Sequence, residues 1–180
     1  MPPATPAPTT TFERAVEITL AYEGEESSDP RDPGGLTRFG ISQRWHPNIK
    51  VAELTRGQAI DYLERLYWFP VRGDLLPWPL CAALFDHAVH SGPDCAIRTL
   101  QAAVGTPIDG LLGPRSRAAL GKAWEASPRA VVAQCIRLRT LELAGEKSAP
   151  AFIGGWMARV ADLHGLCGYE LGWNARLRAA

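Results

Sequence analysis

The amino-acid sequence predicts an all-α (mainly α) fold with one small β-hairpin near residues 35–42. Apolar residues recur at helical spacing along most of the 180-residue chain, and Ser or Thr capping signals precede several of these runs. Only "LTRFGI", at residues 36–41, has the composition of a short strand pair. The 46% hydrophobic content is enough to build a sizeable core.

The first predicted helix begins in "TTFE", residues 10–13, which has the form of a capping box. Phe12, Val16 and Leu20 then follow at intervals of four and share one face. Gly24 is well placed to end the helix because glycine readily adopts the left-handed conformation found there. The loop that contains the predicted hairpin comes next.

A second capping box, Thr55 with Gln58, opens "TRGQAIDYLERLYW". Ile60, Leu63 and Tyr67 lie on one face of this helix. The strongly apolar segment at residues 79–92 predicts a further helix, and its glycine terminus predicts where that helix ends.

Asp94 is expected to cap the next helix, "CAIRTLQAAVG". A turn about Asp109-Gly110 separates it from a helix over residues 115–126. Ser127-Pro128 forms an N-cap and first-turn pair for a long helix. A last helix is predicted for residues 156–166.

Charge and hydropathy exclude several classes of protein. The formal net charge is zero, which argues against nucleic acid as a partner. No apolar run approaches the roughly 18 residues of a membrane span, so we expect no membrane insertion. "MPPATPAPTTT", residues 1–11, lacks the features of a signal peptide and is predicted to be a flexible tail. These features predict synthesis in the cytoplasm without a signal peptide.

The four cysteines, Cys81, Cys95, Cys135 and Cys167, are far apart and form no CxxC pair or Cys/His cluster. Three of them lie in apolar helical segments, so we expect reduced core thiols rather than disulfides or metal ligands. The four histidines have no ligand spacing either. No metal and no organic cofactor is expected.

Three residues in and before the glycine-rich loop have the chemistry of a glycosidase. Glu23 lies in the last turn of the first helix, where the negative end of the helix dipole favours a protonated carboxyl group, as a general acid requires. Asp32 offers a second carboxylate, and Thr37 offers a hydroxyl that can position water. Taken alone, the residues also fit a tight surface loop without catalytic function.

Several segments resemble glycoside hydrolase family 108, the bacterial and phage N-acetylmuramidases. "YEG…DPRDPGGLTRFGIS" is similar to the family's signature loop, and "LERLYWFPVRGDLLP" and "LFDHAVHSGPDCAIRTLQ" resemble two further segments in the same order. "LQAAVGTPIDGLLGPRSRAAL" and "FIGGWMARV" resemble motifs of peptidoglycan-binding modules. The resemblance covers about residues 12–165.

The resemblance implies a lysozyme-like fold in which Glu23, Asp32 and Thr37 match the catalytic glutamate, acid and threonine of the family. It also implies three parts: a tail at 1–11, a catalytic lobe at 12–100, and a helical peptidoglycan-binding lobe at 101–180. A basic excess at 113–139, six Lys/Arg against one acid, fits an anionic polymer or merely solvated helix faces.

Three residues depart from the family pattern. Glu25 adds a negative charge beside Glu23, Arg38 replaces an Asn, and His90 replaces an Asn in "DHAVHSG". If position 90 contacts the substrate, His90 would make affinity depend on pH near 6. Substrate contacts are predicted for the following residues: Arg38, Phe39, Tyr67, Asp86 and His90.

For the aromatic residues, with Trp45 and Trp68 included, a core position is the alternative to stacking on sugar rings. Asp86 either holds the cleft together or touches substrate. Packing and junction roles are expected for Gln101, Asp109-Gly110, Trp156 and Arg159.

The predicted function is therefore an N-acetylmuramidase that cuts the β-1,4 bond between N-acetylmuramic acid and N-acetylglucosamine, with Glu23 as the general acid. The alternative is a non-catalytic peptidoglycan-binding protein that keeps the fold. We expect a monomer that acts on the cell wall after release through a holin or a secretion system. A phage lysis enzyme and a bacterial export-associated enzyme remain open, as do inverting and retaining mechanisms.

Overall fold

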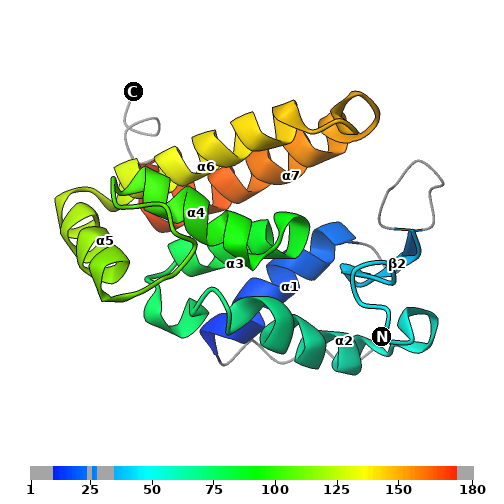
Figure 1. The fold of residues 1–180 in the computed structure, drawn as a ribbon. Coiled ribbons are helices and arrows are strands. Elements are labelled where there is room, and N and C mark those ends of the chain that lie inside the picture. The colour runs from blue at the N-terminus through cyan, green and yellow to red at the C-terminus, as the bar shows by residue number, and fades with distance from the viewer. Residues whose placement is uncertain (1–9, 24–25, 28–34, 174–180) are drawn as a thin grey trace, which may run out of the picture.

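Seven α-helices and a small antiparallel sheet make up the computed structural model, which describes residues 10–23, 26–27 and 35–173 (Figure 1). The α-helices are α1 (Thr11–Glu23), α2 (Arg56–Leu63), α3 (Leu80–Ser91), α4 (Pro93–Ala103), α5 (Pro114–Ala126), α6 (Pro128–Gly145) and α7 (Ala149–Glu170). The strands are β1 (Glu26–Ser27), β2 (Thr37–Arg38) and β3 (Ile41–Ser42). Two 3₁₀ turns, η1 (Val51–Glu53) and η3 (Gly73–Leu75), and a π-helical turn, η2 (Glu64–Trp68), complete the described elements. The predicted mainly-α fold is confirmed.

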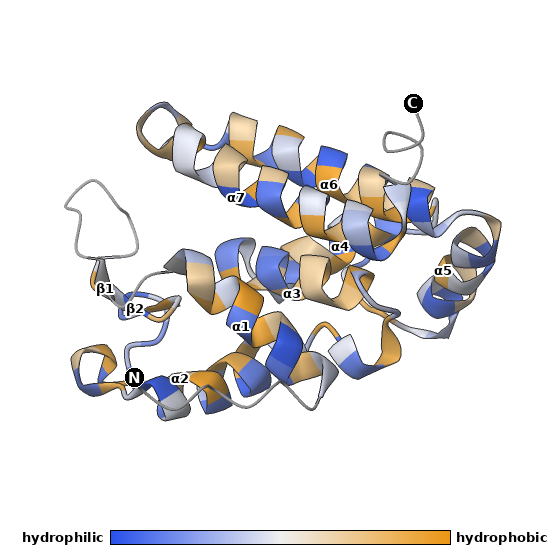
Figure 2. Ribbon diagram, turned by 180° about the vertical axis from the view of Figure 1, so that it is seen from behind, coloured by the Kyte–Doolittle hydropathy of each residue, from blue (hydrophilic) through white to orange (hydrophobic). Residues whose placement is uncertain are grey.

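Helix α3 is the centre of the molecule, and residues 80–89 within it are all buried. A helix that is apolar all round needs cover on every side, and here α1, α4, η2 and η3 pack against it. Helices α6 and α7 lie side by side as a hairpin, and this hairpin packs along the outer side of α4 and α3 (Figure 1). In Figure 2, α1 and α2 alternate hydrophobic and hydrophilic residues, as expected of helices that cover a core.

Three of the predicted helix starts are confirmed in detail. The Thr10 backbone N–H donates to the Glu13 carboxylate over 2.8 Å, and the Glu13 N–H donates to Thr10 Oγ1 over 3.1 Å. Thr55 and Gln58 form the second capping box in the same reciprocal way. The Ser127 hydroxyl accepts from a backbone N–H of α6, one of the donors that a helix start leaves unpaired.

Two helix boundaries differ from the sequence-based prediction. Helix α4 begins at Pro93 with Gly92 as its N-cap, whereas Asp94 lies inside the first turn and binds Arg98 over 2.7 Å. Proline suits the first turn because it has no N–H to leave unpaired. Helix α7 is longer than the predicted range, because packing against α6 outweighs the low helix propensity of its glycines.

The predicted hairpin is formed by β2 and β3, which pair antiparallel with Arg38 opposite Ile41. Phe39 and Gly40 connect them with φ values of 51° and 78°, the two positive values of a tight two-residue hairpin turn. A positive φ is unfavourable for a bulky residue, and burial of the Phe39 side chain offsets that cost. Strand β1 pairs with β2 on its other edge, which the sequence did not predict.

Gln101, as expected, holds the loop after α4. Its amide nitrogen donates to Asp109 Oδ1 over 2.7 Å and to the Ser116 hydroxyl over 3.0 Å. Its amide oxygen accepts from the Gly110 N–H over 2.9 Å. The predicted boundary between residues 100 and 101 falls inside α4, and the division into catalytic and wall-binding lobes stays a prediction.

All four cysteines are free thiols, and Cys81, Cys135 and Cys167 are buried as predicted. Burial raises the pKa of each of these three thiols to about 12, so they are protonated and unreactive at neutral pH. None of the described helices combines the length and apolar character that crossing a membrane requires.

Candidate active site

A cleft of about 710 Å³ lies between the small sheet and the α6–α7 hairpin. Its walls come from the end of α1, the sheet, η2, the ends of α3 and α6, and the starts of α4 and α7. The lining residues are Tyr22, Thr37, Gly40, Ser42, Trp45, Tyr67, Val89, His90, Ser91, Cys95, Glu142, Leu143, Glu146, Ser148, Phe152, Gly155, Trp156 and Arg159. Sugars suit such a site because it combines aromatic faces with polar groups.

The end of α1 borders this cleft. Tyr22 lines it, and α1 ends one residue later, at Glu23. The guanidinium of Arg159 lies 5.8 Å from the centre of the Tyr22 ring. Burial and the nearby Asp162 carboxylate raise the pKa of Tyr22, so its hydroxyl stays protonated. The Glu23 side chain and the whole of Asp32 lie outside the described residues.

Thr37 lies on the sheet side of the cleft. Its hydroxyl donates to the Gly35 carbonyl over 3.4 Å, a long bond that leaves the oxygen able to accept from water. The side chain is half-buried in β2, and the tight turn that follows fixes its direction. The structure therefore brings this predicted catalytic residue into the cleft.

Tyr67 reaches the cleft because of the π-helical turn η2, in which the Phe69 N–H donates to the Glu64 carbonyl over 2.9 Å. The Tyr67 hydroxyl lies 2.9 Å from His46 Nε2. Its neighbour Trp68 is fully buried and contacts the core instead. For Trp68 the core alternative is therefore the correct one, whereas Tyr67 lines the cleft although only 8% of it is exposed.

His90 lies at the end of α3 and contacts the Trp156 ring edge-on, with ring centres 5.2 Å apart. Trp156 in turn stacks with Phe152 one turn earlier in α7, at 6.0 Å and an angle of 27°. Burial, together with the Arg139 and Arg159 guanidinium groups, lowers the pKa of His90 to about 4. The imidazole is therefore neutral at pH 6, which does not support the expected pH dependence there.

Asp86 does not line the cleft, so its predicted substrate contact is corrected. It is fully buried, and it accepts hydrogen bonds from Arg139 and Arg159 over 2.7 Å each. The Thr19 hydroxyl donates to it over 3.1 Å. These partners come from α1, α6 and α7, so Asp86 joins three helices to α3. The two guanidinium groups outweigh the effect of burial and hold the pKa of Asp86 well below its usual range.

Arg38 and Phe39 also lie outside the cleft lining. Phe39 is buried in the core, and Arg38 donates to the Ala52 carbonyl over 2.6 Å. A side chain engaged with η1 in this way supports the hairpin. Phe39 therefore packs in the core and Arg38 joins β2 to η1, so the structure does not support their predicted contact with substrate.

Glu142 and Glu146 are the two acidic residues of the cleft within the described part of the chain. Glu142 lies in the last turn of α6 and Glu146 is the residue that caps its C-terminus, four positions later. This spacing is a signal that sequence reasoning missed. Glu142 is hydrogen-bonded to His87 over 2.8 Å, whereas Glu146 is exposed.

Sequence reasoning also missed the contribution of α7. Phe152, Trp156 and Arg159 form one wall of the cleft, although packing was the role expected for Trp156 and Arg159. Their spacing of four and three residues places them on one face of α7. That spacing does not distinguish a face against the core from a face along a cleft, so helical periodicity alone could not reveal this wall of the site.

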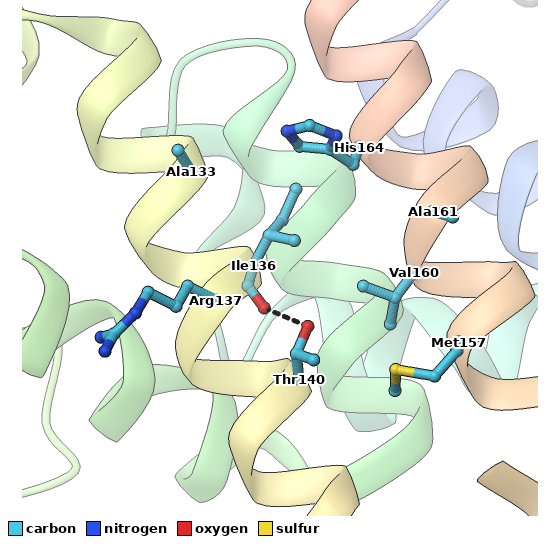
Figure 3. Close-up of a pocket in the computed structure, with 8 residues that line it drawn as sticks. All are labelled: Ala133, Ile136, Arg137, Thr140, Met157, Val160, Ala161 and His164. Atoms are coloured by element: carbon cyan, nitrogen blue, oxygen red, sulfur yellow. Dashed lines mark hydrogen bonds between the residues drawn. The ribbon is translucent and has the colours of Figure 1, made fainter.

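A second, shallower hollow of about 360 Å³ lies between α6 and α7 (Figure 3). Ile136, Met157 and Val160 supply its apolar walls. The Thr140 hydroxyl donates to the Ile136 carbonyl over 2.9 Å and is thereby occupied within α6. None of the described residues that line this hollow carries a carboxylate, the group on which a glycosidase relies.

The comparisons with known proteins agree with this picture. The family model described as Glycosyl hydrolase 108 matches residues 16–92. This range includes the three catalytic candidates, Glu23, Asp32 and Thr37, and the β2–β3 hairpin. The solved structure of Brucella abortus SagA is similar to this chain at 32% sequence identity and a TM-score of 0.79. The match covers 87% of this chain and 93% of the SagA chain. Among curated proteins, none matches the sequence.

Three findings thus point the same way: the family match, the likeness over nearly the whole length of a solved structure, and a cleft lined by Tyr22 and Thr37. The chain belongs to glycosyl hydrolase family 108, and at the level of that family it is a glycoside hydrolase that degrades peptidoglycan.

Proposed function

We propose that this protein is an N-acetylmuramidase that hydrolyses the β-1,4 bond between N-acetylmuramic acid and N-acetylglucosamine. Glu23 protonates the oxygen of the leaving sugar. Asp32 stabilises the positive charge that develops at the anomeric carbon or orients the attacking water. Thr37 holds that water through its hydroxyl. Two acidic groups and a positioned water are what glycoside hydrolysis needs.

The position of Glu23 at the end of α1 supports its role as the acid. The backbone carbonyls of the last turn carry partial negative charge, which favours the neutral form of a carboxyl group there. A carboxyl group that is still protonated near neutral pH can give its proton to a leaving group. The cleft reaches this turn through Tyr22, the preceding residue.

The observation that carries the proposal is the shared cleft. Tyr22 from the end of α1 and Thr37 from β2, two described residues that flank the predicted loop in sequence, line the same cavity, and its volume is large enough for sugar rings. On the opposite wall, Trp156 and Phe152 offer stacked aromatic rings, and the exposed Trp45 adds another. Aromatic faces beside the Glu142 and Glu146 carboxylates suit a glycan better than a folded protein partner.

The test is digestion of purified peptidoglycan by wild type and by Glu23→Gln, with mass spectrometry of the soluble products. We expect fragments that end in reducing N-acetylmuramic acid from wild type and none from the variant. Glu17→Gln is the matched control, because Glu17 is an exposed acid on the same helix that pairs with Arg56. Circular dichroism of both variants checks that α1 is still folded.

Other outcomes would revise the proposal in different ways. Products that end in reducing N-acetylglucosamine would contradict the assigned bond but leave the acid in place. Full activity of Glu23→Gln would contradict the role of Glu23. Binding to the wall without product release by wild type would favour a non-catalytic wall-binding protein.

We also propose that the protein acts as a monomer on the cell wall after release by a holin or a secretion system. Its helical residues 101–180 would hold the glycan or its peptide stems. Light scattering of the purified chain tests the monomer. Expression in bacteria with and without a co-expressed holin tests the release step, because lysis is expected only when the holin is present.

A further inference from the structure

Three side chains that the proposed reaction does not use converge at the base of the cleft. His87, Cys95 and Glu142 each bring one metal-ligating atom within 4.8 Å of the others. His87 Nε2 lies 2.8 Å from Glu142 Oε2 and 3.9 Å from Cys95 Sγ. The three residues come from three helices, α3, α4 and α6, so the cluster exists only in the folded chain.

The turn between α3 and α4 creates this convergence. Gly92 has a φ of 90°, which ends α3 and starts α4 within one residue, and Pro93 then fixes the first turn of α4. His87 in the last turns of α3 and Cys95 in the first turn of α4 are thereby placed side by side. Helix α6 packs on α4 and brings Glu142 to the same point.

We propose that His87 Nε2, Cys95 Sγ and a Glu142 carboxylate oxygen form a binding site for one Zn²⁺ ion. Imidazole, thiolate and carboxylate are each common zinc ligands, and a soft thiolate disfavours Mg²⁺ and Ca²⁺. Three protein ligands leave a fourth tetrahedral position for water. Cys95 and Glu142 both line the cleft, so that position faces solvent and the ion has a path of entry.

The distances fit a zinc ion after small adjustments. Zinc bonds of about 2.0–2.3 Å at tetrahedral angles require ligand atoms roughly 3.4–3.6 Å apart. The Sγ–Nε2 distance of 3.9 Å must shorten by about 0.3–0.5 Å, and the Nε2–Oε2 distance of 2.8 Å must lengthen by about 0.6–0.8 Å. Side-chain rotations accomplish shifts of this size without moving the helices.

A metal ion competes with protons for its ligand atoms, so the protonation state of each of the three side chains affects zinc binding. Burial lowers the pKa of His87, so its imidazole is already neutral at pH 7. Burial alone would raise the pKa of Glu142, but hydrogen bonds from His87, Ser91 and Cys95 outweigh it and bring the value to about 2. Glu142 is therefore an ionised ligand before any metal arrives.

Cys95 is the residue that must lose a proton. Burial and the neighbouring Glu142 carboxylate raise the pKa of its thiol to about 12. As the S–Zn bond forms, the S–H bond breaks and the proton passes to the buffer, because a coordinated thiol is deprotonated by the metal charge. Zinc affinity should accordingly rise with pH. His87 stays neutral but changes tautomer: its Nε2–H donates to the ionised Glu142 in the metal-free chain, so this proton moves to Nδ1 through solvent as Nε2 binds the metal.

The experiment is a titration of the full, untagged chain with Co²⁺ and then Zn²⁺. Cobalt reports the ligands directly, since a thiolate–Co²⁺ bond absorbs in the near ultraviolet and tetrahedral cobalt absorbs in the visible range. We expect one Co²⁺ per chain with both bands, and we expect Zn²⁺ to abolish them by displacement. Thermal unfolding should shift to higher temperature with Zn²⁺ and return after a chelator is added.

Cys95→Ala and Cys135→Ala form a matched pair of variants, since Cys135 is a buried thiol from a different part of the core. Cys95→Ala should lose the ultraviolet band. It should also lower the zinc affinity by more than about 100-fold, because loss of a direct ligand should cost more than the roughly 10- to 100-fold that loss of a residue behind a ligand costs. Cys135→Ala should keep both. Glu142→Gln keeps the shape of the site but should weaken zinc in the same direction as Cys95→Ala.

Either of two results overturns the proposal. One is the absence of a thiolate–Co²⁺ band in folded wild type, which would leave His87 and Glu142 as a hydrogen-bonded pair only. The other is a band that survives in Cys95→Ala, which would place the metal at another thiol. Muramidase activity decides neither result, so the proposal does not depend on the assigned reaction.

Discussion

Arg159 binds Asp86 through two of its nitrogens, with Nη2 2.7 Å from Oδ1 and Nε 3.0 Å from both carboxylate oxygens, although 73 positions separate the residues in sequence. Arg139, from α6, also donates a hydrogen bond to the Asp86 carboxylate. The ion pairs connect the central helix α3 to the hairpin that forms one wall of the cleft. Arg159 also lines that wall, so the shape of the cleft depends on this buried contact.

Asp86→Asn should lower the free energy of unfolding by about 3–5 kcal/mol, because two buried guanidinium groups lose the negative charge that compensates them. Urea denaturation followed by circular dichroism measures the change. Glu53→Gln is the control: it removes an acid from an exposed pair with Lys50, and exposed pairs contribute little. Equal stability of Asp86→Asn and wild type would mean that the network does not hold the hairpin.

Thr37→Ala should reduce kcat on peptidoglycan by about 10- to 100-fold without changing the thermal midpoint, because a misplaced water slows hydrolysis but the core is untouched. Thr37→Ser keeps the hydroxyl and should recover most of the rate. Release of reducing ends over time gives kcat for each variant. Equal rates for Thr37→Ala and Thr37→Ser would argue against a role for the hydroxyl.

Trp156→Ala should raise KM by several-fold to about 10-fold, since an aromatic contact is worth about 0.5–1.5 kcal/mol, and kcat should change less. Tyr169→Ala is the matched control, because Tyr169 is an exposed aromatic residue on the same helix outside the cleft lining. Steady-state kinetics on soluble glycan fragments separate the two constants. An unchanged KM for Trp156→Ala would remove α7 from the proposed substrate contacts.

Stability should fall as the pH drops from about 6.5 to about 4, and His90 is one cause. Burial lowers its pKa to about 4, below the roughly 6.5 of an unfolded chain, so the unfolded state binds the proton first. The contribution is complete above pH 6.5 and is lost toward pH 4. His87 is buried with a lowered pKa and acts in the same direction.

His90→Asn should therefore make this decrease shallower, with the remaining slope due to His87 and His46 and, near pH 4, to Glu142. Urea denaturation at pH steps from 7 to 4 measures the slope. His164→Asn is the control, since His164 is exposed on α7. A slope that is the same in wild type and His90→Asn would contradict the assignment to His90.

Local patterns accounted for the helices because their causes are local. The capping boxes at Thr10 and Thr55 and the N-cap at Ser127 each involve residues three apart, and all three formed as predicted. The hairpin at residues 37–42 also formed, because a two-residue turn fixes its own register. The extent of α7 was underestimated, since packing on α6 decides it and propensity does not.

The cleft residues that the sequence predicted all come from the N-terminal half of the chain. Thr37, Tyr67 and His90 lie in the cleft as expected, whereas Asp86, Arg38 and Phe39 do not. A carboxylate in an apolar helix is costly unless paired, and its partners 53 and 73 positions away leave no trace in the local pattern. The choice between a substrate contact and a buried ion pair was therefore open in the sequence.

By itself, the sequence determined the fold class, the family resemblance and the loop that carries the catalytic candidates, because each is written in neighbouring residues. The tertiary structure alone decided which residues face the cleft and that His87, Cys95 and Glu142 meet. These three lie on helices that meet only when α6 packs on α4. Helical spacing shows that residues share a face, but long-range packing decides what that face contacts.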